Sequence, residues 1–210
     1  MTGYCVRKPS AAVALLLLFA GPVVAQWPPD ENPQFFPSGV FVSNRSILAR
    51  GYSWFLRSMQ EKPLADCVSR ECPQVYRVLI ETRPYNAPVV VRLWIRSDGV
   101  SERVTKVGRD GGHPQILSVS KTADPSRVDV DKFLKLLEEA GFWSMPTEFA
   151  KPTAMGASGW MLEGMRGDKY HLVCRSAPEL GPLKDPLDFL VVGLAKLDLK
   201  SLPVGPRGLR

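Results

Sequence analysis

The chain has 210 residues, of which 45% are hydrophobic and 23% are charged, and it carries a formal net charge of +6 at neutral pH. These proportions are typical of a globular protein and exclude an intrinsically disordered chain. The basic excess is small, so it favours ordinary solubility over nucleic-acid binding.

The first 25 residues have the pattern of a secretory signal peptide. Arg7 and Lys8 precede an apolar run over residues 11–20, and small residues end at Ala25. The run has about half of the ~20 residues that a membrane span needs, so a membrane anchor is the weaker alternative. We predict cleavage near Ala25 and a periplasmic or secreted mature chain without a transmembrane span. That chain keeps 25 basic and 21 acidic side chains, a net charge of +4.

Two segments precede the main domain. Residues 26–43 are rich in proline and are predicted to form an extended leader. Residues 44–60 place apolar side chains on one helical stripe, so the unit 44–74 is predicted to be an amphipathic helix followed by a linker. We expect the stripe to pack on the main domain, since such packing is the usual source of helix stability. The alternative is a helix that binds a membrane surface or a partner.

Three cysteines remain after cleavage: Cys67, Cys72 and Cys174. In an oxidising compartment the closely spaced Cys67 and Cys72 are predicted to form a disulfide. Cys174 is then left over, and we expect it to be a buried apolar side chain rather than a reactive thiol.

Residues 75–200 are predicted to form an α+β domain, and residues 201–210 a flexible tail. Strand-like segments are expected at 75–82, 89–97, 100–107 and 115–120, and on both sides of Gly167-Asp168. Helices are expected over 129–140 and from Asp185 onward. Sequential antiparallel strands and two apolar-faced helices predict one antiparallel sheet of five to six strands with two helices on one face. The N-terminal helix is an addition to this core.

The Asp98-Gly99 pair is the strongest hairpin signal in the chain. Pairing across it as a two-residue turn predicts one apolar face and one face rich in arginine. The apolar face holds Val91, Leu93, Ile95, Val100 and Val104, and the other holds Arg92, Trp94, Arg96 and Arg103. A tryptophan between arginines can stack a planar or sugar-like group, while guanidinium groups hold carboxylate or phosphate. The alternatives are mutual stacking of arginine on tryptophan, or burial of Trp94 by the N-terminal helix.

The Gly167-Asp168 hairpin holds Glu163, His171 and Cys174. A two-residue type II′ turn pairs His171 with Gly164 and Glu163 with Leu172, so Glu163 and His171 face apart. A turn one residue longer or shorter would change this. A zinc site built from three cysteines and His171 is disfavoured, because strand alternation points His171 and Cys174 to opposite faces. We therefore expect no metal and no cofactor.

The final hairpin also carries a resemblance. This part of the chain has, in order, a helix, Gly141-Phe142-Trp143, Pro146, Gly159–Gly164, Tyr170–Val173 and a proline-rich exit. This order resembles that of a family of uncharacterised exported bacterial domains. The resemblance covers about residues 75–198, by element order. It implies a small α+β domain in the cell envelope. It implies no activity, so no residue inherits a catalytic role from it.

The sequence thus predicts a monomeric, non-catalytic module that binds an envelope protein or an anionic or saccharide ligand through Arg92, Trp94, Arg96 and Arg103. The alternative is a small envelope hydrolase or metal-binding protein centred on Glu163 and His171. No serine or cysteine stands in a nucleophile setting such as Gly-x-Ser-x-Gly, which disfavours the hydrolase. A third possibility is that the N-terminal helix supports another envelope protein.

Overall fold

The structure is a computed structural model, and it describes residues 35–41, 46–67, 73–81, 88–99, 101–108, 117–147, 159–176 and 180–198. All of these residues belong to one compact unit, Pro33–Arg210. This unit is larger than the domain predicted over 75–200, because it includes the N-terminal helix. The predicted signal peptide and the predicted tail lie outside the described residues.

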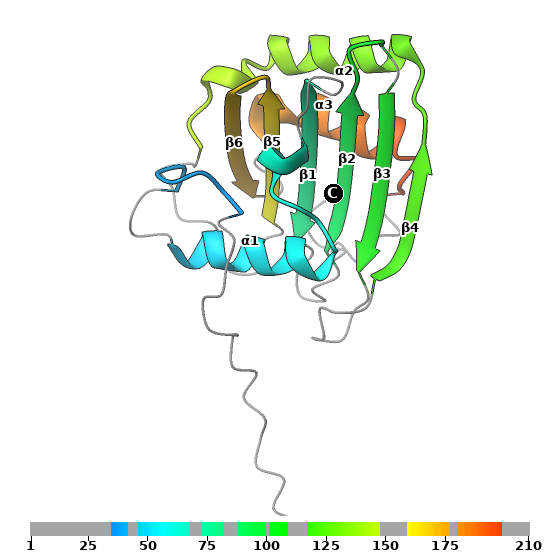
Figure 1. Cartoon of the computed structure of the whole chain (residues 1–210). Helices are drawn as coiled ribbons and strands as arrows, with labels where there is room; N and C mark the ends of the chain where they lie inside the picture. The colour runs from blue at the N-terminus through cyan, green and yellow to red at the C-terminus, as the bar shows by residue number, and fades with distance from the viewer. Residues whose placement is uncertain are drawn as a thin grey trace, which may run out of the picture. The chain divides into compact units, whose positions relative to one another are not determined.

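Six strands form a single antiparallel sheet in the order β4-β3-β2-β1-β5-β6 (Figure 1). The strands are β1 Gln74–Glu81, β2 Val89–Ile95, β3 Ser101–Gly108, β4 Leu117–Ala123, β5 Gly159–Arg166 and β6 Lys169–Ser176. The α-helices are α1 Ser46–Ser58, α2 Arg127–Glu139 and α3 Lys184–Asp188. Short helical turns are η2 Leu64–Cys67, η3 Phe142–Ser144 and η4 Gly181–Leu183, and α3 continues into the π-helix η5 Phe189–Leu194. The predicted α+β class and single antiparallel sheet are confirmed.

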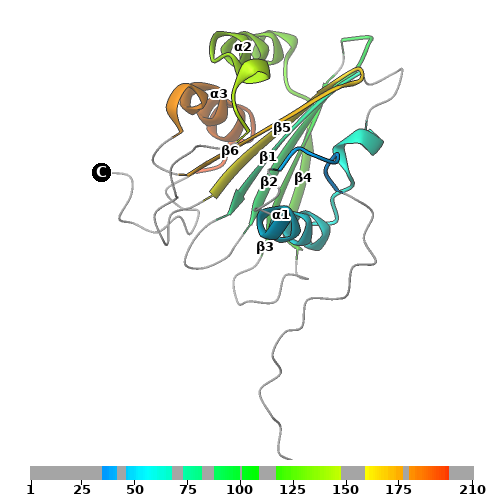
Figure 2. The same cartoon turned by 90° about the vertical axis from the view of Figure 1, so that its left-hand side faces the viewer.

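Helices lie on both faces of the sheet (Figure 2). The face under α2 and α3 carries the larger apolar core, in which fully buried strand residues meet Phe133 of α2 and Leu190 of η5. The strand residues of this core include Tyr76, Val78, Val91, Leu93, Leu162 and Val173. α2 begins two residues before the predicted start, because the Ser126 hydroxyl accepts a hydrogen bond from the Asp129 backbone N–H at 3.2 Å.

The opposite face, which we call the α1 face, carries a second core. α1 contributes Tyr52, Phe55 and Leu56, and Met59 follows directly after its end. Phe35 and Phe36 join them, and the sheet supplies Leu79, Val90, Met161, Leu172 and Cys174. The apolar stripe of the N-terminal helix therefore covers the sheet, which confirms the predicted packing. Burial of Cys174, whose exposed fraction is 8%, is confirmed as well.

The two hairpins differ in how well their registers follow the sequence. In β5–β6, Arg166 pairs with Lys169 across Gly167-Asp168, and Gly167 has a φ of +59°, as a type II′ turn requires. In β2–β3 the predicted register is wrong by one residue. Ile95 pairs with Ser101 rather than with Glu102, and in the turn that follows β2 the Gly99 N–H donates to the Arg96 carbonyl at 3.1 Å and Gly99 has a φ of +83°.

The one-residue shift in β2–β3 moves the side chains of β3 to the opposite faces from those predicted. Val104 pairs with Arg92, and Arg103 pairs with Leu93. Val104 therefore lies on the α1 face, and Arg103 lies on the face under α2 and α3.

Candidate functional site: a buried charged row beside Trp94

A row of charged side chains crosses the α1 face of the sheet. Arg77 of β1 pairs directly with Arg92 of β2 on one side and with Glu163 of β5 on the other. Directly paired residues share a face, so the three side chains stand next to one another. Arg77 and Glu163 have exposed fractions of 0%, and Arg92 of 7%. Such burial of charged groups requires partners of opposite charge.

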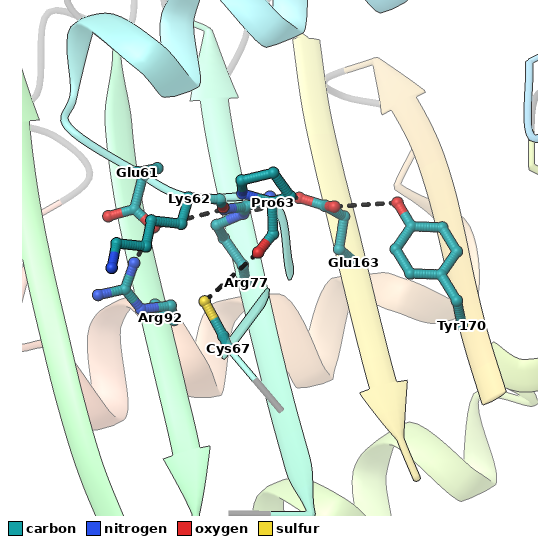
Figure 3. A network of polar contacts seen from close by, with 8 residues as sticks. All are labelled: Glu61, Lys62, Pro63, Cys67, Arg77, Arg92, Glu163 and Tyr170. Carbon is teal, nitrogen blue, oxygen red and sulfur yellow. Dashed lines mark hydrogen bonds and ion pairs between the residues drawn. The ribbon is translucent and has the colours of Figure 1, made fainter. Parts of the chain in front are cut away.

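Arg77 and Glu163 form the centre of this row (Figure 3). Arg77 Nε donates to Glu163 Oε2 at 2.7 Å, and its Nη2 lies 2.6 Å from the same oxygen. The Tyr170 hydroxyl of β6 donates to the other carboxylate oxygen at 2.9 Å. Both oxygens of Glu163 are thereby engaged. Charge-assisted hydrogen bonds of this kind are stronger than neutral ones.

Glu61 reaches the row from the segment that follows α1. Its Oε2 accepts a hydrogen bond from Arg92 Nη1 and lies 3.4 Å from Arg77 Nη1. The neighbouring Lys62 carbonyl accepts from Arg77 Nη1 at 2.6 Å. Among the described residues, these contacts join two arginines to two glutamates, and the formal charges of these four balance.

The backbone that positions Glu61 is strained. α1 ends with hydrogen bonds from the Gln60 N–H to the Arg57 carbonyl and from the Glu61 N–H to the Leu56 carbonyl, each 2.9 Å long. This is the Schellman pattern, in which the residue after the helix takes a left-handed conformation that glycine prefers. Gln60 occupies that position with a φ of +55°. A residue with a side chain costs about 1 kcal/mol in this conformation. The backbone is therefore strained at Gln60, directly before Glu61.

Burial is the largest influence on the pKa values of Glu163 and Tyr170. It raises the pKa of Glu163, while the ion pair with Arg77 and the hydrogen bond from Tyr170 act in the opposite direction. The pKa of Tyr170 is raised well above its ordinary value, chiefly by burial and by the Glu163 carboxylate. Tyr170 is therefore a neutral hydrogen-bond donor to Glu163 at physiological pH.

Cys67 points toward the same network from η2 (Figure 3). Its thiol donates to the Pro63 carbonyl at 3.5 Å, and burial raises its pKa, although Arg92 and Arg77 oppose the rise. Cys67 is a free thiol in this structure, so the predicted disulfide is not seen. Its predicted partner, Cys72, lies outside the described residues.

Arg92 also contacts Trp94, two residues further along β2. The Arg92 Cζ atom lies 3.9 Å from the centroid of the Trp94 ring, a close cation–π stack. Trp94 is half-buried. Arg92 Nε is buried, and no acceptor among the described residues receives a hydrogen bond from it. A buried donor of this kind ordinarily meets water or a ligand.

The four predicted binding residues do not form one surface. Arg92 and Trp94 stand together, as the stacking alternative anticipated. Arg96 lies in the turn, half exposed, 3.3 Å from the Asp98 carboxylate. Arg103 is on the other face, where it is buried and donates to the Leu194 carbonyl at the end of η5. The placement of Arg103 with Trp94 was wrong because of the β2–β3 register.

The two residues of the predicted enzyme alternative lie on opposite faces. Glu163 pairs with Leu172, and His171 pairs with Gly164, which confirms the predicted β5–β6 register. The His171 ring lies 5.0 Å from the Phe142 ring, under η3. The two side chains therefore cannot act on one substrate atom. Within the described ranges, no group of three or more histidine, cysteine, aspartate or glutamate side chains is arranged to hold a metal ion.

His171 is expected to make the stability depend on pH. Burial lowers its pKa, and the positive charges of Lys169 and Arg175 add to the lowering, while a hydrogen bond with the Met145 backbone opposes it. A depressed histidine pKa contributes stability that is present above the unfolded pKa, about 6.5, and is lost as the pH falls through the folded value.

The free energy of unfolding should therefore fall as the pH is lowered from about 7.5 to about 5, and His171→Gln should make the fall smaller. Urea unfolding of both proteins across this range checks the prediction. Parallel pH profiles for the parent and the variant would contradict it.

Sequence reasoning missed Glu61 and Arg77, and it singled out Tyr170 in the final hairpin without giving it a role. One signal was present: Arg77 interrupts the otherwise apolar run Val75–Ile80. A charged residue inside a buried strand needs a partner, because charged side chains are almost never fully buried unless paired. The partners themselves lie far away in sequence, at 16 and 86 residues from Arg77.

No protein-family model matches the sequence, and a search of curated proteins finds no match. The resemblance to exported bacterial domains therefore remains a proposal. Across the described part of the chain, the helices are all too short or too polar to cross a membrane.

Proposed function

We propose that this protein is an exported, non-catalytic binding module of the cell envelope that holds its ligand at Arg92 and Trp94. The observation that carries the proposal is the stacked pair itself. Arg92 lies on a half-buried tryptophan and keeps a buried N–H donor that no described residue accepts. An aromatic ring beside a few polar groups is the usual composition of a ligand site.

The surroundings of the pair support a ring-shaped or sugar-like ligand. On the α1 face, Trp94 pairs with the half-buried Glu102 of β3, and exposed Thr122 and Ser120 of β4 lie further along the same face. None of the described helices lies in front of β3 and β4 on this face (Figure 1). The surface beside Trp94 therefore offers a ligand the Glu102 carboxylate on the neighbouring strand, while the Thr122 and Ser120 hydroxyls lie two strands away.

Trp94→Ala should weaken ligand binding at least about tenfold, because a tryptophan at the centre of a binding surface is a typical hot spot. The mature protein is screened against an array of neutral and acidic saccharides, and each hit is measured by isothermal titration calorimetry. Trp94→Phe, which keeps an aromatic ring, should lose less affinity than Trp94→Ala.

Trp143→Ala is the matched control. Trp143 is another half-buried tryptophan with a stacked cation, since Arg166 Cζ lies 4.7 Å from its ring, but it packs on the core under α2 and α3. This variant should bind like the parent. Folded Trp94→Ala and Arg92→Met variants that bind every hit as tightly as the parent would refute the site, and an array without hits would refute the saccharide class.

A further inference from the structure

We infer that the ligand carries a carboxylate on a ring, and that Glu61 competes with it for Arg92. The segment that runs from the start of α1 to the end of η2, residues 46–67, would then be loosened when the ligand binds. We call this segment the strap. This inference rests on the proposed function, because it concerns the same arginine. It adds the chemical class of the ligand and a means by which the chain regulates its own site.

The charge balance of the row points to a carboxylate. Glu163 is committed to Arg77 through two close contacts. Glu61 is the carboxylate that Arg92 holds, and its side chain has an exposed fraction of 0%. If Glu61 leaves, Arg92 stands buried beside Arg77, and only an anionic replacement restores the balance. A neutral ligand would leave an arginine without a counter-charge.

The geometry of Arg92 also favours an external carboxylate. A guanidinium group can hold a carboxylate through two parallel N–H donors. Glu61 accepts from Nη1 through one oxygen, while the Nε donor has no acceptor among the described residues. A ligand carboxylate approaching along Nε gains a hydrogen bond that the contact with Glu61 does not supply. Its ring would then lie against Trp94, on which Arg92 is stacked at 3.9 Å.

The strap is built to release. Gln60, directly before Glu61, holds a left-handed backbone conformation that is strained for any side chain. If the two backbone hydrogen bonds that cap α1 open when Glu61 withdraws, this residue can relax. Strained residues cluster at ligand clamps and switch regions. Because Glu61 is tethered, its effective concentration at Arg92 is high, and an external ligand binds weakly until the strap opens.

The test uses the full mature protein with four probes: benzoate and glucuronate as ring carboxylates, and benzamide and glucose as their neutral counterparts. Sodium chloride keeps the ionic strength equal. Calorimetry should show that the carboxylates bind the parent weakly and bind Glu61→Gln at least about tenfold more tightly, because the internal competitor loses its charge. The neutral probes should not bind, and Arg92→Met should bind none of the four. Benzoate and glucuronate distinguish an aromatic acid from a sugar acid.

A second measurement needs no variant of Glu61. In the parent protein, hydrogen exchange of the α1 amides, Ser46–Ser58, should accelerate with benzoate or glucuronate and stay unchanged with benzamide or glucose. If Glu61→Gln does not fold, this result alone decides the matter. Carboxylate binding to the parent without faster exchange in α1 would refute the strap and leave the proposed function standing. Failure of both carboxylates to bind the parent and to change its exchange would refute the carboxylate class, while the Trp94 screen would still test the site.

Discussion

Arg77→Met is expected to lower the free energy of unfolding by about 3–5 kcal/mol, because it leaves a buried carboxylate without its counter-charge. Arg77 gives Glu163 two contacts below 2.8 Å, and both side chains are fully buried. Tyr170 remains as a donor to Glu163 but carries no positive charge. Urea unfolding at neutral pH, followed by tryptophan fluorescence, measures the loss.

Two controls separate this effect from a general sensitivity of the sheet to arginine loss. Arg96 pairs with Asp98 at 3.3 Å with both side chains about half exposed, so Arg96→Met should cost less than about 0.5 kcal/mol. Adding Glu163→Leu to Arg77→Met should restore part of the lost stability, since it removes the orphaned charge. A double variant no more stable than Arg77→Met would contradict the account.

The stability of Arg77→Met should approach that of the parent protein in acid. Loss of Arg77 removes the main influence that opposes the burial-driven rise in the pKa of Glu163. A carboxyl group whose folded pKa lies above its unfolded value contributes stability below the unfolded pKa and loses it as the pH rises through the folded pKa. The difference in unfolding free energy between the parent and Arg77→Met should therefore shrink as the pH falls below neutrality.

Arg103→Met is expected to lower the free energy of unfolding by about 2 kcal/mol, the usual worth of a buried hydrogen bond to a charged group. Arg103 is 7% exposed and donates to the Leu194 carbonyl, the last residue of η5. A cation at the end of a helix also opposes the partial negative charge of its terminal carbonyls. Urea unfolding measures this loss too.

Binding provides the contrast. Arg103 lies on the opposite face from Trp94, so folded Arg103→Met should bind every ligand of the parent with unchanged affinity. Weaker binding with unchanged stability would mean that Arg103 belongs to the binding surface, as the sequence alone suggested.

The sequence predicted the fold well where the deciding interactions are local. The turn at Gly167-Asp168 holds two residues, so the register of β5–β6 and the opposed directions of Glu163 and His171 follow from strand alternation. The turn at Asp98-Gly99 has the same kind of signal, but Gly99 takes a left-handed conformation and Ile95 pairs with Ser101, so the register is shifted by one residue. Loop length decides register, and one residue placed Arg103 on the wrong face.

The candidate site was harder to predict because it depends on contacts between distant segments. Glu61 comes from a region whose sequence indicates a linker, and it meets Arg92, 31 residues away, only because α1 packs across the sheet. Glu163 meets Arg77 because β5 adds to the sheet beside β1 rather than beside its neighbour in sequence, β4. Neither fact is encoded in a short motif. The stripe of α1 indicates that a face is covered, but not which charged group it brings with it.

The charged row has a consequence for how the sheet assembles. Arg77 is aligned with Arg92 and Glu163 on its two neighbouring strands, while the next residue, Val78, is aligned with Val91 and Leu162. If β1 slipped by one position, the guanidinium of Arg77 would enter the apolar layer beneath α2 and α3, and either Tyr76 or Val78 would stand opposite Glu163. Each such misalignment would leave charged side chains buried without a partner, at a large cost in free energy. The charged row thus favours the native register of β1 over registers shifted by one residue.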